Sequence, residues 1–299
     1  MSTTDTSHSN NSRGPEAWSE SWKHVRIDRR SASYCRVTFD HPPINTVTAA
    51  TVAELAELVD LIEEDADLNV VVFDSANPDF YLAHYDTEGD PAKTMSMPPG
   101  PTGMHPWLDL TARLSRAPVV SIASVRGRAR GAGSEFVLAC DIRLAGDKAI
   151  LAQFEVGTGV VPGGGPMARL PRLIGRGRAL EVLLVADDID AALAERYGYV
   201  NRVVPDDRLE HETDRVARRL ASFDKQAIAE TKAFVDATSL PADEELPPAL
   251  TAFFASAARP AARSRLAALA SRGLGRDSEL ERRLGDLVTL ASDDGGDSG

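Results

Sequence analysis

The stretch from residue 118 to residue 141 constrains the fold more than any other part of the chain. It begins with an apolar, β-branched run, Pro118 to Val125, which predicts a buried strand. A glycine-rich turn follows, and the apolar residues Phe136 to Ala139 then predict the first turns of a helix. Such a turn lets backbone approach a ligand closely and directs helix-start N–H groups at negative charge. Because Glu135 lies in the first helical turn, we expect an anion-stabilising turn with an acid/base residue attached.

Composition and charge exclude several classes of protein. The chain has 299 residues, of which 43% are hydrophobic, enough for one large α/β domain or for a domain with a helical appendage. Its formal net charge of −12 argues against a nucleic-acid partner, because phosphate backbones require clustered Lys and Arg. No apolar run approaches the roughly 18 residues of a membrane span, so we also predict no membrane partner.

Both ends of the chain have the composition of disordered tails. Residues 1–20 are polar, with much Ser and Thr, and lack the apolar segment of a signal peptide. Residues 291–299 form an acidic tail. The two cysteines, Cys35 and Cys140, lie in apolar surroundings, which favours buried free thiols over a disulfide and predicts a cytoplasmic protein.

Between the tails, the hydrophobic pattern predicts short β-β-α units followed by an all-helical end. Two alternating runs within residues 22–39 predict a hairpin. Apolar residues on one stripe from Val52 to Ile62 predict a helix, and Val70 to Phe73 predict a buried strand. We therefore expect an α/β core over residues 21–205 and a helical region over residues 206–290.

Two further segments carry specific expectations. Residues 89–106 are rich in Pro, Gly, Met and Ser without a period, which is typical of either a functional lid or a disordered segment. Residues 272–286 mix Arg with Asp and Glu, and this mixture predicts an ordinary surface helix.

The glycine-rich turn does not match the common nucleotide-binding motifs. A dinucleotide fingerprint requires a small residue where this chain has Phe136, and Glu155 precedes a Gly-rich turn instead of ending a second parallel strand. A phosphate-binding P-loop fails because Ala132-Gly133-Ser134 stands where G-K-[ST] is required. Nor does Gly133-Ser134-Glu135-Phe136 form a G-x-S-x-G nucleophile elbow.

Several motifs occur in a characteristic order along the chain. In order, they are His41-Pro42-Pro43-Ile44-Asn45-Thr46-Val47, Phe80 to Asp86, Val119 to Gly127, Gly131-Ala132-Gly133-Ser134-Glu135, Ala139-Cys140-Asp141-Ile142-Arg143, Glu155 to Gly165, and Gly198 to Val204. Over residues 22–235 this order resembles the crotonase (enoyl-CoA hydratase/isomerase) superfamily. The resemblance implies an α/β spiral of ββα units with a C-terminal helical region that packs the chain into homotrimers or hexamers.

The resemblance also implies an oxyanion hole. In this family two backbone N–H groups hold an acyl carbonyl oxygen as the substrate becomes enolate-like, and such preorganised donors supply a large part of the rate. The matching turn is Leu82-Ala83-His84-Tyr85-Asp86, which assigns the first donor to the N–H of Tyr85. The second donor matches the N–H of Ala132, the middle residue of Gly131-Ala132-Gly133. Leu82, Ala83, Gly131 and Gly133 are then expected to line the substrate.

The two glutamates of the hydratase members match Glu135 and Glu155. Paired carboxylates suit the addition of water to a double bond, because one takes the proton from water and the other supports or delivers a proton at carbon. Packing the two acids together in an apolar pocket should raise one pKa and keep the pair singly protonated.

The first turn departs from the family pattern, because His84 and Tyr85 stand where small residues are usual. The backbone N–H donors are present whatever side chain the residue carries. The binding of a CoA nucleotide at this turn stays open, because Asp86, Glu88 and Asp90 would repel its phosphates. His84 could itself take part in chemistry, because imidazole titrates near neutrality, or its side chain could point away from the pocket.

The sequence thus predicts an enoyl-CoA hydratase-like lyase that adds water to, or removes it from, an α,β-unsaturated acyl thioester. Its partner is an acyl-CoA substrate, and we expect neither a cofactor nor a metal. Two alternatives stay open: an isomerase, and a crotonase-fold enzyme acting on a carrier-bound substrate or on a free ketone as a C–C bond hydrolase.

Overall fold

The computed structural model describes residue 18, residues 22–87, residue 89 and residues 91–290. The tails predicted for residues 1–20 and 291–299 lie outside the described residues, apart from Trp18. The Trp18 indole is buried in the main core, and the guanidinium of Arg29 lies 4.8 Å from its ring centroid.

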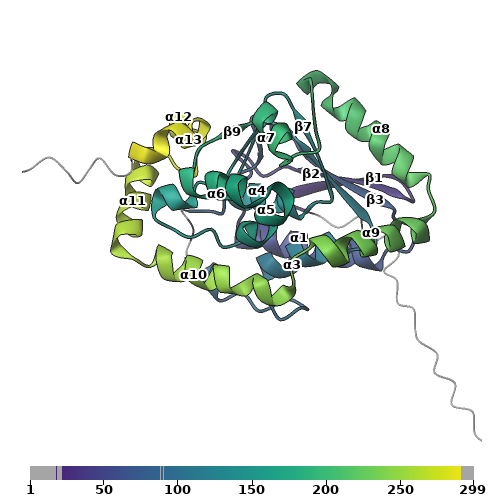
Figure 1. The fold of residues 1–299 in the computed structure, drawn as a ribbon, viewed down its shortest axis with the longest axis horizontal. Helices are drawn as coiled ribbons and strands as arrows, with labels where there is room; N and C mark the ends of the chain where they lie inside the picture. Colours follow the sequence, from purple (N-terminus) through teal and green to yellow (C-terminus); the bar gives the residue numbers. More distant parts are fainter. Residues whose placement is uncertain (1–17, 19–21, 88, 90, 291–299) are drawn as a thin grey trace, which may run out of the picture.

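Two sheets organise the fold (Figure 1). The larger sheet has the strand order β1-β2-β3-β5-β7-β10, and the smaller has the order β4-β6-β8-β9. β1 is antiparallel to β2 and β9 is antiparallel to β8, whereas the other neighbours are parallel. The strands are β1 (Val25–Ser31), β2 (Tyr34–Phe39), β3 (Val70–Ser75), β4 (Phe80–Leu82), β5 (Val120–Val125), β6 (Arg128–Arg130), β7 (Ile142–Gly146), β8 (Ile150–Ala152), β9 (Ile189–Asp190) and β10 (Arg202–Val204).

Helices follow the strands and then make up the whole C-terminal region. They are α1 (Ala49–Glu64), α2 (Pro91–Met95), α3 (Pro106–Arg116), α4 (Ala132–Ala139), α5 (Pro166–Ile174), α6 (Arg176–Val185), α7 (Ala191–Tyr197), α8 (Leu209–Ala221), α9 (Lys225–Ser239), α10 (Pro247–Ala257), α11 (Pro260–Ser271), α12 (Glu279–Arg282) and α13 (Leu284–Leu287). Short 3-10 turns are η2 (Glu155–Thr158), η3 (Asp206–Arg208) and η4 (Asp243–Glu245).

The chain passes repeatedly from the larger sheet to the smaller one. β3 is followed by β4, β5 by β6 and β7 by β8, and each pair is followed by helical structure. This confirms the predicted spiral of ββα units. Because β4, β6 and β8 are parallel, their carboxyl ends lie at one edge of the smaller sheet, so the three turns that follow them meet.

Phe136 shows why the helix after the glycine-rich turn sits where it does. Its buried ring packs edge-on against Phe39 and Phe73, with ring centroids 5.4 and 5.0 Å away. Burying such a side chain contributes about 1.5–3 kcal/mol. The residue that excludes a dinucleotide fingerprint therefore anchors α4 against the core of the larger sheet.

One strand departs from the sequence-based expectation. The segment before Gly131 has the composition of a turn, yet Arg128–Arg130 form β6 and pair with β4 and β8 on either side. A strand of three residues is too short to show a period, so its conformation is decided by these long-range pairings.

The segment of residues 91–106, as far as it is described, packs against the rest of the molecule. It contains α2, and Met104 is buried with Leu108 and Leu246. The Thr94 hydroxyl donates to the Tyr85 phenol oxygen at 3.2 Å, so this segment lies beside the first predicted oxyanion turn.

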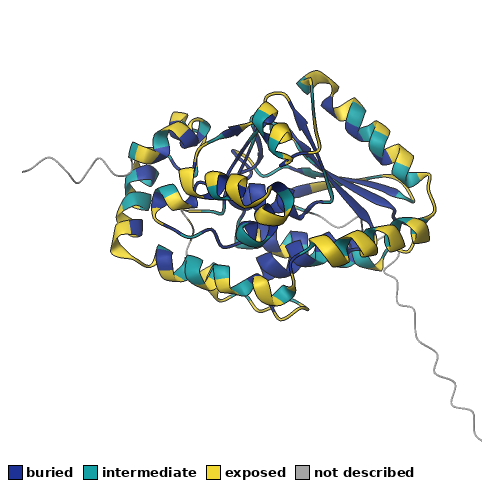
Figure 2. Ribbon diagram, viewed as in Figure 1, coloured by how far each residue is buried: buried dark blue, intermediate teal, exposed yellow. Residues whose placement is uncertain are grey.

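The C-terminal helices wrap the core. α8 packs on β3, β5 and β7, α10 packs beside α3, and α11 to α13 gather around Phe154, which follows β8 (Figure 1). Their outer faces are largely exposed, whereas the strands in the middle of the larger sheet are mostly buried (Figure 2). Whether this region also packs copies of the chain into trimers stays a prediction.

The surface helix expected over residues 272–286 is wrong. This stretch forms α12 and α13, and Leu280, Glu281 and Leu284 within it are buried. Cys35 and Cys140 are buried free thiols, as predicted. Within the described ranges, no helix has both the length and the apolar character needed to cross a membrane.

Candidate active site

Three segments at the carboxyl ends of β4, β6 and β8 hold the residues predicted for the site. Residues 83–85 follow β4, residues 131–135 follow β6, and Glu155 lies three residues after the end of β8. The structure therefore brings together segments that are far apart in sequence, as the family resemblance implies.

Glycines allow these segments to touch. A Cβ on Gly133 would lie 1.6 Å from the carbonyl oxygen of Leu82, so α4 begins directly against the first turn. A Cβ on Gly131 would lie 2.9 Å from Oε1 of Glu155 and 3.2 Å from Cβ of His84, and its φ of +49° also favours glycine. Any side chain at either glycine would push the turns apart.

Tyr85 presents its backbone N–H away from the neighbouring chain. It forms a parallel bridge with Val47, in which Val47 N–H donates to the His84 carbonyl and Asp86 N–H donates to the Val47 carbonyl. In such a bridge the middle residue turns its own N–H to the opposite side. Among the described residues, no backbone acceptor is found for the N–H of Tyr85.

Ala132 presents the second N–H. It is the first residue of α4, so its N–H has no partner within the helix and points out of the helix N-terminus. No described backbone group accepts from it. The side chains of Leu82 and Ala83 are buried in apolar clusters, so these two residues offer only backbone atoms to the site.

Glu135 is buried, at 5% exposure, and is held by two donors. The indole Nε1–H of Trp107 donates to its Oε2 at 2.9 Å, and the N–H of Gly164 donates to its Oε1 at 2.7 Å. Burial raises the pKa of Glu135, while these two hydrogen bonds and the charge of Arg169 act in the opposite direction. A Cβ on Gly164 would lie 1.8 Å from Oε2, so only glycine fits there.

Glu155 is also buried, at 9% exposure, but its surroundings differ. Its Oε2 has no hydrogen-bond partner among the described atoms. Burial, and then the charge of Glu135, raise the pKa of Glu155 to about 8, despite opposing contributions from its own backbone N–H and from His84. The two acids therefore interact and hold a proton near neutral pH, which suits acid/base chemistry.

The imidazole of His84 is turned toward the C-terminal region. Its Nδ1 lies 2.7 Å from the Tyr85 carbonyl oxygen, and its Nε2 lies 3.0 Å from Oε2 of Glu281. Burial alone would lower the pKa of His84, but Glu281 and the Tyr85 carbonyl outweigh burial and raise it. Both ring nitrogens are thus engaged, and a role of His84 in proton transfer stays a prediction.

Sequence analysis missed three residues of this region: Trp107, Gly164 and Glu281. A buried Trp needs an acceptor for its N–H, so Trp107 could have been flagged once its helix was predicted to be core-facing. Gly164 lies in a recognised sharp turn, but nothing local shows that its N–H faces a carboxylate. Glu281 lies in a charged run that gives no sign of burial.

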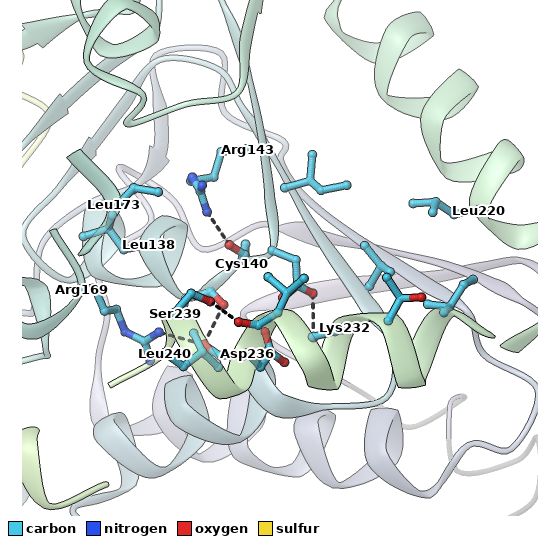
Figure 3. A pocket seen from close by; sticks show the side chains of 18 of the residues that line it. Leu138, Cys140, Arg143, Arg169, Leu173, Leu220, Lys232, Asp236, Ser239 and Leu240 are labelled. Atoms are coloured by element: carbon cyan, nitrogen blue, oxygen red, sulfur yellow. Dashed lines mark hydrogen bonds and ion pairs between the residues drawn. The ribbon is translucent and has the colours of Figure 1, made fainter. Parts of the chain in front are cut away.

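A separate cavity of about 620 Å³ is lined in part by α9, and neither Glu135 nor Glu155 lines it (Figure 3). Two of the charged groups in its wall are paired: Asp141 accepts from Lys232 Nζ at 2.7 Å, and Arg143 donates to the Cys140 and Tyr199 carbonyls. The acid pair, rather than this cavity, marks the candidate active site. In the described part of the chain, no group of three or more His, Cys, Asp or Glu could hold a metal ion.

Known proteins share this fold and sequence. A family model for enoyl-CoA hydratase/isomerase matches residues 29–257. A carnitinyl-CoA dehydratase of Citrobacter koseri is 32% identical over 220 residues, 72% of this chain and 82% of that protein. A crotonyl-CoA hydratase of Syntrophomonas wolfei is 44% identical over 112 residues, 38% of this chain and 43% of that protein.

The similarity extends to solved structures. One from Streptomyces avermitilis, named as an enoyl-CoA hydratase, has a TM-score of 0.85 and 39% sequence identity, covering 90% of this chain and 97% of that one. With the matched family model and the ββα spiral, this similarity assigns the fold and the ancestry. The chain belongs to the enoyl-CoA hydratase/isomerase family of the crotonase superfamily.

Proposed function

We propose that the protein catalyses the reversible addition of water to an α,β-unsaturated acyl-CoA thioester. The observation that carries the proposal is the buried pair Glu135 and Glu155, of which one is held by two N–H donors and the other has an unpartnered oxygen. The crotonyl-CoA hydratase and carnitinyl-CoA dehydratase among the relatives support it, because both are named for adding or removing water.

The surroundings of the two acids suggest their roles. Glu135 accepts two hydrogen bonds that favour its ionised form, so it serves as the base that takes a proton from water. Glu155 has a raised pKa and therefore carries the proton that is delivered to carbon.

The reaction then balances in three movements. The water oxygen bonds to the β-carbon while Glu135 takes the proton, and the π electrons move toward the thioester oxygen. The backbone N–H groups of Tyr85 and Ala132 hold that oxygen as an enolate, and each such donor is worth about 10²- to 10³-fold in rate. Glu155 protonates the α-carbon, and a proton passing from Glu135 to Glu155 restores the starting state.

A screen with crotonyl-CoA and longer enoyl-CoA thioesters tests the proposal through loss of the conjugated absorbance. We expect turnover by the native chain and a loss of about 10²- to 10⁴-fold in each of Glu135→Ala and Glu155→Ala, which should remain folded. Near-normal activity in both variants would reject the assignment of the two acids.

The same assay separates the remaining alternatives. A β,γ-unsaturated thioester that gains conjugation without taking up water would indicate an isomerase. Calorimetric titration with CoA and acetyl-CoA addresses the altered turn at His84 and Tyr85, since a complete lack of binding would favour a carrier-bound or CoA-free substrate.

A further inference from the structure

Each of the three site segments carries one side chain that faces the C-terminal end of the chain instead of the site. These side chains are His84 in the first oxyanion turn, Arg130 just before the second, and Phe154 next to the proposed acid Glu155. All three contact the segment of residues 274–288. This segment contains α12 and α13, which are labelled in Figure 1.

Glu281 is the centre of these contacts. Its side chain is 1% exposed, and its Oε2 accepts from the His84 imidazole at 3.0 Å and from the Gly275 N–H at 3.0 Å. His84 directly precedes Tyr85, and its imidazole lies 2.7 Å from the Tyr85 carbonyl oxygen. The position of the imidazole is therefore coupled to the backbone on both sides of Tyr85.

Arg130 links the second oxyanion turn to the same residue. Its guanidinium donates to the backbone carbonyl of Glu281, lies 4.0 Å from Oε1 of Glu281, and forms a paired contact with the Asp188 carboxylate at 2.7 and 2.6 Å. Planar, two-pronged contacts of this kind fix orientation as well as charge. Arg130 ends β6, so its placement fixes where Gly131 and Ala132 begin.

Phe154 supplies the apolar part of the contact. Its ring lies 5.3 Å from the His84 ring and packs in a buried cluster with Leu269, Leu274, Leu280, Leu284 and Val288. Glu155 follows immediately, so the third site segment rests on the same support.

We infer that Glu281 is a positioning residue, which joins both oxyanion turns to the C-terminal segment through His84 and Arg130. The inference rests on the proposed function only for the identity of the two N–H donors. A displacement of about 1 Å at a reacting group can cost about 10²-fold in rate, so a support of this kind affects turnover without touching substrate.

The charge of Glu281 is compensated by protein groups on neighbouring elements, because its carboxylate is buried away from solvent. His84 and Arg130 face its carboxylate, Asp188 neutralises Arg130, and Arg128 donates to the Arg282 carbonyl beside it at 2.8 Å. Removing the carboxylate takes away the hydrogen-bond acceptor of the His84 imidazole and of the Gly275 N–H, together with the anion that faces Arg130, which favours movement of the two turns.

The first experiment compares Glu281→Ala with Glu279→Ala. Glu279 lies on the same helix but is exposed, and its carboxylate pairs with the surface residue Arg283. We expect Glu281→Ala to lower kcat by about 10- to 100-fold with KM changed less than about 3-fold, and Glu279→Ala to resemble the native chain. An unchanged kcat in folded Glu281→Ala, or an equal loss in Glu279→Ala, overturns the inference.

The second experiment uses Glu281→Gln, which keeps the shape of the side chain and, unlike the alanine variant, leaves no cavity in the core. Hydrogen exchange is measured on peptides covering residues 82–87 and 130–136, with the β1–β2 hairpin as reference. We expect exchange to become faster in both turns and to stay unchanged in the hairpin. Exchange that is unchanged in the turns, or raised throughout, overturns the inference. Because exchange needs no substrate, a failed hydratase assay is distinguished from a failed positioning role.

Discussion

The buried acid pair Glu135 and Glu155 and the single buried acid Glu281 lie beside the same backbone turns, and the pKa values of the pair and of Glu281 are shifted in opposite directions. Glu135 and Glu155 face each other's charge, and the pKa of both is raised, mainly by burial. Glu281 is at least as buried, but His84, Gly275 and Arg130 outweigh the effect of burial and lower its pKa. Burial alone therefore does not decide what an acid does.

The difference lies in the partners of each acid. A carboxylate that faces cations is held ionised and fixes the geometry of its neighbours, whereas a carboxylate that faces another acid keeps a proton it can transfer. Glu281 is suited to hold the turns in place, and Glu135 and Glu155 are suited to act on a substrate. Each prediction below tests one side of this division.

The largest expected effect is at Glu155. Glu155→Gln should lower turnover by about 10²- to 10⁴-fold, because the amide cannot deliver a proton to carbon. The free energy of unfolding should stay the same or rise, because a neutral amide removes the cost of ionising a buried acid beside Glu135. Enoyl-CoA turnover and urea unfolding measure the two effects. A marked loss of stability would show that Glu155, like Glu281, holds the structure together.

The second prediction concerns the pH dependence of the stability that the contact between His84 and Glu281 provides. Because the pKa of His84 is raised, the contribution of His84 to stability is complete below its ordinary pKa of 6.5. That contribution is lost as pH rises through the raised pKa. The lowered pKa of Glu281 means that its contribution is complete above its ordinary value of 4.5 and is lost as pH falls through the lowered pKa.

Glu281→Gln should therefore reduce the free energy of unfolding most between about pH 4.5 and 6.5, by about 1.5–3 kcal/mol, with a smaller difference on either side. Urea unfolding across this pH range measures the difference, and Glu279→Gln serves as control with a small, flat one. A deficit that does not vary with pH would show that the pair is not ionised.

Much of the fold followed from local patterns in the sequence. The hairpin, α1 and the buried strands follow from alternation and apolar stripes, and Phe136 signalled core packing rather than nucleotide binding. β6 was missed because three residues between glycines carry no period, and only its pairing with β4 and β8 makes them a strand.

The site was only partly predictable, for a different reason. Glu135, Glu155 and the two oxyanion turns came from the resemblance to a family, not from any local period. Glu281 is separated from His84 by 197 residues and lies among surface-like charges, so its burial is a product of tertiary packing. The contact between Trp107 and Glu135 is equally non-local, although a buried indole predicts that some acceptor exists.

The smallest expected effect would refine the comparison within the catalytic pair itself. The hydrogen bond from the Trp107 indole lowers the pKa of Glu135, so Trp107→Phe should raise it while the ring still packs near Phe136. If Glu135 is the base and must be ionised, the acidic limb of the kcat profile should move to higher pH and kcat near neutrality should fall by about 3- to 10-fold. Trp22→Phe is the matched control, because the buried Trp22 indole nitrogen has no partner among the described atoms. A shift of the alkaline limb instead would exchange the roles of the two acids, because it would show that Trp107 supports the proton donor.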